Sequence, residues 1–314
     1  MPPMIGGLEL PKICPHFLTL RVAIRPHLQD HVHIGLSGGP DSLALVAAAR
    51  AEGAAVTALC INHNLQQASA AVSEEAARQA ELMGAVAVIR SIQVPLGNGM
   101  EAAAREARYA EFAQLTSTIW TGHTMDDQAE TFLLAGLRGN PAGMKETSRR
   151  PDLRIVRPLL GVRRANTHGA CAELALSPWS DPQNFDHAFR RVAIRERAIP
   201  LLAEIHEGDP VPGLALAASR AARNEEVLEG VVDKQRGQWA EGFPVALASE
   251  PPALRHHMLA DFLRGHGVRV TSKKLEAIDR LLTHWHGQGG VAVGKTATGR
   301  LEVVRVSGKL RVTG

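Results

Sequence analysis

Residues 37–42 read Ser-Gly-Gly-Pro-Asp-Ser, and their types and spacing suit the binding of an anion. Gly38 and Gly39 allow close backbone approach, the hydroxyls of Ser37 and Ser42 donate, and the free N–H groups of a following helix attract negative charge. A carboxylate such as Asp41 repels phosphate unless a divalent cation lies between them. The loop, which includes Pro40, therefore predicts a nucleotide with Mg²⁺ and makes Asp41 the cation ligand. It is no G-x-x-x-x-G-K-[ST] loop, and an ordinary strand-to-helix turn is the alternative.

A second polar stretch, residues 122–131, reads Gly-His-Thr-Met-Asp-Asp-Gln-Ala-Glu-Thr. Asp127 and Glu130 are three residues apart, so they share one face of the helix that begins here. His123 precedes the helix and could reach the same cleft. Two acids and a histidine could hold Mg²⁺, bind an amine or take a proton. Helix capping is the alternative; we favour it for Asp126 but favour function for Asp127 and Glu130.

Alternating strands and helices should position both stretches. Apolar runs predict strands, and amphipathic segments between them predict helices. This βαβ rhythm is typical of an α/β fold with an open parallel sheet and helices on both faces. Ligands bind beyond the carboxyl ends of such strands, where residues 37–42, 62–64 and 122–123 all lie. The predicted strands are 32–36, 55–61, 85–92 and 119–121, and the predicted helices are 42–51, 71–83, 100–115 and 126–138.

The remaining sequence predicts a long connector helix and a small α+β C-terminal domain. We expect an N-terminal helical extension (1–30), a catalytic domain (31–210), the connector (211–243) and the C-terminal domain (244–314), which should contain helices at 253–265 and 273–284. Residues 289–296 formally fit G-x-x-x-x-G-K-[ST]. Because a helix precedes them and a β-rich segment follows, we interpret them as a β-hairpin.

Composition is that of a globular chain of 314 residues, with 45% hydrophobic and 21% charged residues. Cys14, Cys60 and Cys171 form no C-x-x-C pair, which is typical of a reducing cytoplasm, and no apolar run predicts a signal peptide or a membrane span. The net charge is +3, but residues 138–197 hold 12 Lys and Arg against 6 Asp and Glu. That surplus suits a phosphate-rich partner, and a solvated face is the alternative.

The chain resembles the tRNA(Ile)-lysidine synthetases of the PP-loop (N-type ATP pyrophosphatase) superfamily, whose fold is adenine nucleotide alpha hydrolase-like. Four segments carry the resemblance, and residues 254–282 weakly resemble the second domain of the family. The first segment is shared across the superfamily, whereas the second is more specific. The four are residues 37–42 (S-G-G-x-D-S), 122–139 (G-H-x-x-D-D-Q-x-E-T and its continuation), 157–160 (Arg-Pro-Leu-Leu), and 181–184 with Arg191, Arg195 and Pro200.

The resemblance implies a reaction and its participants. ATP adenylates the wobble cytidine of tRNA(Ile) with a CAU anticodon, pyrophosphate leaves, and the amine of free L-lysine displaces AMP. Residues 37–42 would hold pyrophosphate, and Asp41 would hold Mg²⁺. Asp127 and Glu130 would bind the lysine ammonium, with His123 assisting. The resemblance leaves a homodimer open.

Arginines supply the opposite charge in this interpretation. Arg105 or Arg108 would face phosphate or the adenylate, and Arg138 would contact phosphate or tRNA. Arg191 and Arg195 would bind nucleic-acid phosphate or stabilise charge that develops at the cytidine. The acids then attract the cationic substrate, whereas the arginines attract ATP and tRNA.

Three departures from the family pattern stand out. Val192 replaces an Asn that commonly follows the first arginine of the R-N-x-x-R segment. Residues 63–66 lack the arginine of an H-G-L-R-like turn. The chain also ends earlier than some members, so we expect recognition of the tRNA acceptor end to be reduced or rearranged.

Two other functions remain open at this stage. A tRNA thiolation enzyme uses the same loop but needs cysteine, and Cys60 is the candidate; we interpret it as a core residue. A non-catalytic RNA-binding protein on the same fold is the second alternative. The histidines around His256, His266 and His284 to His286 lack cysteines or acids at ligand spacing, so we assign them no metal.

Overall fold

The computed structural model describes residues 4–62, 69–92, 100–180, 187, 189–295 and 299–314. The chain divides into two compact units, Met1–Ala222 and Arg223–Gly314. The boundary falls inside a long helix, α9 (Val211–Gln235), where a connector helix was expected. No helix in the described ranges has the length and apolar character needed to cross a membrane.

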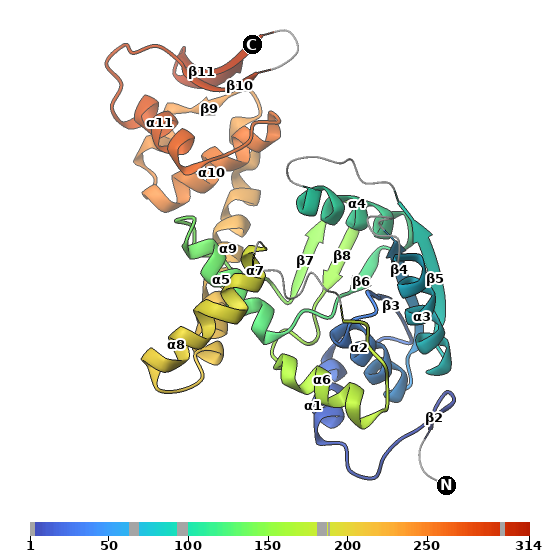
Figure 1. Ribbon diagram of the computed structural model, residues 1–314. Helices are drawn as coiled ribbons and strands as arrows, with labels where there is room; N and C mark the ends of the chain where they lie inside the picture. The colour runs from blue at the N-terminus through green and yellow to red at the C-terminus, as the bar shows by residue number, and fades with distance from the viewer. Residues whose placement is uncertain (1–3, 63–68, 93–99, 181–186, 188, 296–298) are drawn as a thin grey trace. The chain divides into compact units, whose positions relative to one another are not determined.

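A six-stranded sheet forms the centre of the first unit (Figure 1). The strand order is β5-β4-β3-β6-β8-β7, and every neighbouring pair is parallel except β7 with β8. The strands are β3 (His31–Gly35), β4 (Ala55–Asn62), β5 (Val86–Ser91), β6 (Thr118–Trp120), β7 (Thr147–Arg150) and β8 (Leu153–Val156). The predicted α/β fold with an open parallel sheet is confirmed, except that the edge strand β7 is antiparallel.

Helices cover both faces of this sheet, because alternate strand residues point to opposite sides. Ala58 and Cys60 of β4 pack into a core shared with α1 and α2, whereas Leu59 packs on the other face against Tyr109 and Phe112 of α4. The helices of this unit are α1 (Pro15–Ile24), α2 (Pro40–Ala51), α3 (Ser69–Leu82), α4 (Met100–Leu115), α5 (Met125–Gly136), α6 (Arg164–Glu173), α7 (Arg190–Ala193) and α8 (Ile199–His206). A short hairpin, β1 (Met4–Ile5) with β2 (Leu8–Glu9), precedes α1.

The hairpin β7–β8 was missed by the sequence prediction, which ended the strand pattern before residue 141. Asp152 makes the tight turn with φ of 59°. Arg149 and Arg150 give β7 a polar edge rather than an apolar run, and charged edge strands are a common protection against aggregation. The sheet therefore has two more strands than expected, and its edge strand β7 is antiparallel to β8.

The second unit packs two helices on an antiparallel sheet of order β10-β11-β12-β9. Its elements are β9 (Phe243–Pro244), α10 (Pro252–Gly265), α11 (Ser272–Thr283), β10 (Val291–Lys295), β11 (Arg300–Val306) and β12 (Lys309–Thr313). Val293, Val303 and Leu310 face the core of Phe243, Phe262 and the helices. Residues 289–296, which formally fit G-x-x-x-x-G-K-[ST], were predicted to form a β-hairpin, and β10 does pair with β11 in antiparallel fashion. Thr296 lies outside the described residues.

A buried ion pair joins the two helices of this unit. Arg255 is 6% exposed, and its Nε lies 2.5 Å from Oδ1 of Asp279. Its Nη1 also donates to the carbonyl oxygens of Ala248 (3.0 Å) and Glu250 (2.6 Å). Removing one member of such a pair leaves the other buried and uncompensated.

We therefore expect Asp279→Ala to destabilise the second unit by about 3 to 5 kcal/mol. Chemical denaturation followed by fluorescence of the buried Trp239 would report this change. Glu276→Ala, at an exposed position of the same helix, is the matched control and should change stability by less than about 0.5 kcal/mol. Equal stability of the two variants would contradict this account of the ion pair.

Candidate active site

The glycine loop (residues 37–42) connects β3 to α2 at the carboxyl edge of the sheet. Ser42 holds it closed: its Oγ accepts from the N–H of Ser37 (3.2 Å) and donates to the carbonyl of Gly39 (3.0 Å). Gly38 has φ of 82°, and a Cβ there would lie 3.2 Å from Cβ of Ala76. Only glycine takes this conformation without strain. The helix begins at Pro40, two residues earlier than predicted.

Gly122 brings the second polar stretch against this loop. A Cβ added at Gly122 would lie 2.9 Å from the carbonyl carbon and oxygen of Asp41 and 3.1 Å from the nitrogen of Ser42. Any larger residue would push the two segments apart. The glycine therefore explains how residues 80 positions apart in sequence form one site, as the sheet topology predicted.

Asp127 caps α5, which corrects the interpretation of this helix start. Thr124 is the N-cap, and a capping box joins it to Asp127: Oδ2 of Asp127 accepts from the N–H of Thr124 (2.8 Å) and from its hydroxyl (2.7 Å). We had given the capping role to Asp126. Asp126 instead pairs with the guanidinium of Arg163 (3.2 Å) and accepts from the N–H of Arg164 (2.7 Å) at the start of α6.

Arg164 is the site residue that sequence reasoning missed. Its Nη2 donates to Oδ1 of Asp127 (2.7 Å), and its Nη1 donates to Oε1 of Glu130 (2.9 Å). Its Nε lies 4.0 Å from Oδ2 of Asp41. One guanidinium thus joins the acids of both stretches. The only signal in the sequence was its place in the arginine-rich segment, which had been interpreted as a surface for phosphate.

Glu130 is the most enclosed acid of the site, with a side chain 0% exposed. Beside Arg164 it accepts from Nε of Arg195 (2.8 Å), and Nη1 of Arg191 lies 3.6 Å from its Oε2. Arg191 also donates to the hydroxyl of Thr131 (3.3 Å). Arg191 belongs to α7, and Arg195 belongs to a π-helical turn, Ile194–Ala198, of the kind often found at functional sites. Three guanidiniums therefore surround one buried carboxylate.

Electrostatics separate the two aspartates. Burial raises the pKa of Asp41 to about 6, and the negative charge of Asp127 adds to this, while a hydrogen bond from Thr167 and the charge of Arg164 oppose it. Burial also disfavours the charge on Asp127, but Arg164, His123 and the bonds from Thr124 outweigh it and hold the pKa of Asp127 below its usual value. Asp41 is thus the carboxylate that most lacks a cation.

His123 lies in the same site as a neutral imidazole. Its Nδ1 is 2.8 Å from Oγ1 of Thr121. Burial lowers the pKa of His123 to about 3, Asp127 opposes this, and the positive charges of Arg157, Arg105 and Arg108 lower it further. At neutral pH the ring therefore acts through hydrogen bonds rather than as an imidazolium.

Tyr109 of α4 is the centre of an arginine cluster on the face of the sheet opposite α1 and α2. The guanidinium carbons of Arg105, Arg108 and Arg150 lie 5.2, 5.8 and 4.4 Å from the ring centroid. Arg157, 5% exposed, donates to the carbonyl of Lys145 (2.6 Å). Its Nε is a buried atom without a hydrogen-bond partner among the described residues. The structure brings the two predicted arginines of α4 together around Tyr109, and Arg150 joins them there.

The remaining predicted residues lie either away from the acids of the site or outside the described part of the chain. Arg138 is exposed in the turn after α5, eleven residues beyond Asp127, or about 16 Å along the helix axis at 1.5 Å per residue. Residues 63–66 and 181–184, including the expected Asp-Pro-Gln-Asn segment, lie outside the described residues. Val192, in place of the family's Asn, is buried in α7.

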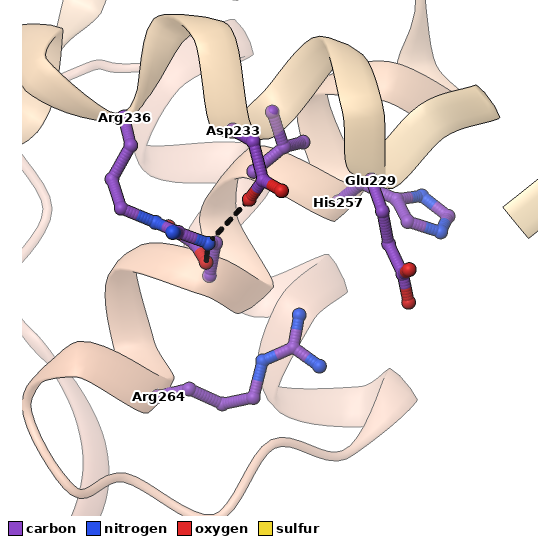
Figure 2. A pocket seen from close by; sticks show the side chains of 7 residues that line it. Glu229, Asp233, Arg236, His257 and Arg264 are labelled. Atoms are coloured by element: carbon purple, nitrogen blue, oxygen red, sulfur yellow. Dashed lines mark hydrogen bonds and ion pairs between the residues drawn. The ribbon is translucent and has the colours of Figure 1, made fainter. Parts of the chain in front are cut away.

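The second unit has a polar pocket of its own, of about 280 Å³ (Figure 2). Glu229, Asp233 and Arg236 line it from the chain around α9, and His257, Asp261 and Arg264 line it from α10. Asp233 and Asp261 both pair with Arg236 (2.8 and 2.7 Å). This pocket has no glycine loop that could hold phosphates, so the site of the first unit is the better candidate for catalysis.

Two family descriptions match the chain. A PP-loop domain matches residues 18–202, and a TilS substrate binding domain matches residues 245–311. The first contains the glycine loop and every acid of the site. The second covers most of the second unit.

Curated relatives match over the full length of the chain. A tRNA(Ile)-lysidine synthase of Corynebacterium efficiens is 81% identical over 314 residues, covering 100% of both chains. Its counterpart in Corynebacterium glutamicum is 69% identical over 313 residues, again covering 100% of both. That of Rhodococcus erythropolis is 40% identical, covering 94% of this chain and 95% of the relative.

Among solved structures, the U34-tRNA thiolase NcsA from Methanococcus maripaludis, solved with its 4Fe-4S cluster, has a TM-score of 0.52. The two sequences are 16% identical, and the match covers 68% of this chain and 79% of that chain. At this identity the likeness shows a shared fold alone.

Proposed function

The chain belongs to the tRNA(Ile)-lysidine synthase family, and we propose that it makes lysidine on tRNA(Ile) with a CAU anticodon, using ATP and free L-lysine. One observation carries the proposal beyond family membership. Asp41, Asp127 and Glu130 meet around a single guanidinium at the mouth of the glycine loop. The loop offers donors for a triphosphate, and the acids beside it offer negative charge for Mg²⁺ and for a cationic amine.

In the first step the wobble cytidine attacks the α-phosphate of ATP, and pyrophosphate leaves. The glycine loop and the start of α2 offer hydroxyls and N–H groups to the departing phosphates. Asp41 would hold Mg²⁺, because it offers carboxylate oxygens beside the loop and its ion pair with Arg164 is long, with Nε 4.0 Å from Oδ2. Bound there, the cation would neutralise the charge on the phosphates.

In the second step the amine of lysine displaces AMP. Asp127 and Glu130 supply the carboxylates for its ammonium, yet every one of their oxygens already has a partner in the structure. Oδ1 of Asp127 and Oε1 of Glu130 both bind Arg164. We infer that lysine displaces Arg164 from these oxygens and that its ammonium binds where the guanidinium now lies.

The other cations complete the charge balance. Arg105 and Arg108, which lie against Tyr109, would bind phosphate or the adenylate. Arg191 and Arg195 stabilise Glu130 and keep donors for charge that develops at the cytidine. His123, which is neutral, orients a substrate by hydrogen bonding. The second unit contacts tRNA, while dimerisation of the chain stays a prediction.

The experiment is an assay of pyrophosphate release from ATP by the whole chain. We expect release that depends on tRNA(Ile) and Mg²⁺ and does not need lysine, since adenylation precedes the amine. Folded protein that binds the tRNA but releases no pyrophosphate would contradict the proposal and favour a non-catalytic RNA-binding protein.

Cysteine chemistry gives a further prediction. Cys60 is buried, and burial raises its pKa to about 12, so its thiol stays protonated. Cys171 donates to the carbonyl of Pro40 (3.4 Å), and burial raises its pKa to about 12 as well. Neither is a thiolate at neutral pH.

We expect Cys60→Ser and Cys171→Ala to keep lysine incorporation within about fivefold of the wild type, because Cys60 packs in the core and Cys171 makes only a weak thiol hydrogen bond to the glycine loop. Labelled lysine in tRNA is the readout, with circular dichroism as the control for folding. Complete loss of tRNA modification in a folded Cys60→Ser protein would favour a thiolation enzyme instead.

A further inference from the structure

We propose that Trp285 is a stacking platform for one unpaired base of the tRNA. This inference rests on the proposed function, which supplies tRNA as the ligand. Trp285 lies in the turn between α11 and β10, within the segment that matches a substrate binding domain. Its side chain is 38% exposed, whereas Trp120 and Trp239 are buried.

Arg305 holds the indole from one side. Its guanidinium carbon lies 5.2 Å from the centroid of the Trp285 ring. Its Nη1 donates to the carbonyls of Leu281 (2.9 Å) and Leu282 (3.4 Å) at the end of α11. The arginine thus ties the ring to the helix through a cation–π contact. The guanidinium covers part of the indole, and the exposed part of the ring remains for a ligand.

The turn that carries Trp285 is held by its own side chains. Oγ1 of Thr283 lies 2.8 Å from Nδ1 of His284. Gln288 donates to the carbonyl of His284 (3.0 Å) and accepts from the N–H of His286 (2.8 Å). A preorganised turn loses little entropy when a ligand binds. The exposed His284 and His286 flank the indole and offer polar groups beside a stacked base.

The C-terminal segment that carries this turn is basic, which favours RNA as the occupant. Residues 262–314 hold ten lysines and arginines against three acids. Two of these acids are engaged, Asp279 with Arg255 and Glu302 with Arg300. Several of the cations make no hydrogen bond or ion pair through their side chains within the described ranges; they are Lys273, Arg280, Lys295 and Arg311. Basic surfaces with an exposed aromatic ring are typical of proteins that bind unpaired nucleotides.

The test measures binding of a tRNA(Ile) transcript to the whole chain, without ATP or lysine. Stacking of one base contributes enough that Trp285→Leu should weaken the Kd about 5- to 100-fold. Trp285→Phe keeps an aromatic face and should stay within about threefold of the wild type. Arg280→Ala, one turn away on α11, is the matched charge control. It should reduce the slope of log Kd against log salt by about 1, whereas Trp285→Leu should leave the slope unchanged.

A second readout works even if the leucine variant folds poorly. Stacking quenches indole emission, so tRNA should quench the fluorescence of the wild type more than that of Trp285→Phe. The difference in quenching between the two proteins is the contribution of Trp285. Equal quenching, or a folded Trp285→Leu protein with wild-type affinity, would overturn the platform while leaving lysidine synthesis intact. Failure of the wild type to bind tRNA at all would overturn both proposals, so the two failures are distinguishable.

Discussion

Asp41→Asn is expected to reduce tRNA-dependent pyrophosphate release by about 100- to 1000-fold, which is the usual cost of losing a group that stabilises transition-state charge. The amide keeps the shape and still accepts from Thr167, but it is a poor ligand for Mg²⁺. Because the change acts at ATP, both half-reactions should fail together. Pyrophosphate release and lysine incorporation measured on the same samples would check this; loss of lysine incorporation alone would contradict it.

The same substitution should change stability in the opposite direction. The pKa of Asp41 is raised to about 6, so keeping it ionised costs the folded state free energy, and the wild type loses stability as pH rises from about 4 through 6. Asp41→Asn has no carboxyl group to ionise at this position, so its stability does not fall over this pH range for that reason. Without ligands it should be more stable than the wild type by about 3 kcal/mol at pH 7.5, and the difference should vanish near pH 4. A destabilised variant at pH 7.5 would contradict the assigned pKa.

Glu130→Gln is expected to have the second large effect, on both activity and folding. Its carboxylate, 0% exposed, faces Arg164, Arg191 and Arg195, so the amide would leave three guanidiniums without their shared acid. We expect a loss of about 3 to 5 kcal/mol in the free energy of unfolding. Lysine incorporation should fall at least about 100-fold.

Asp126→Asn is the matched control for this prediction. Asp126 lies on the same helix and pairs with Arg163; it contacts Arg164 only through the backbone N–H, an interaction that the amide oxygen of asparagine can keep. Urea unfolding and initial rates at several lysine concentrations would compare the two variants. Asp126→Asn should keep activity within about threefold. If Glu130→Gln were as stable and as active as Asp126→Asn, the buried carboxylate would have neither role.

The sequence predicted the part of the site that depends on local patterns. The apolar strand before residue 37 and the Gly-Gly turn after it required a strand, loop and helix, and the carboxyl-edge rule then brought residue 122 to the same place. The capping box could also have been found, because Thr124 and Asp127 have the spacing of the capping motif. Because the sequence analysis favours a functional role for Asp127, it does not assign Asp127 to the helix cap.

The position of Arg164 could not be predicted in the same way. It reaches the acids from a helix that begins 34 residues after Glu130, and no period or spacing links the two. The pairing depends on how α6 packs against α2, which tertiary contacts decide. The hairpin β7–β8 escaped for a related reason, since an edge strand rich in arginine has little apolar pattern to detect.

Transfer of labelled lysine to tRNA tests the central claim most directly. The whole chain would be incubated with ATP, Mg²⁺, labelled lysine and a tRNA(Ile) transcript that carries a CAU anticodon. The account predicts ATP-dependent label in this tRNA, none when the wobble cytidine is replaced by uridine, and a loss of at least about 100-fold with Asp127→Asn. Folded wild-type protein that binds the tRNA and leaves it unlabelled would contradict the account.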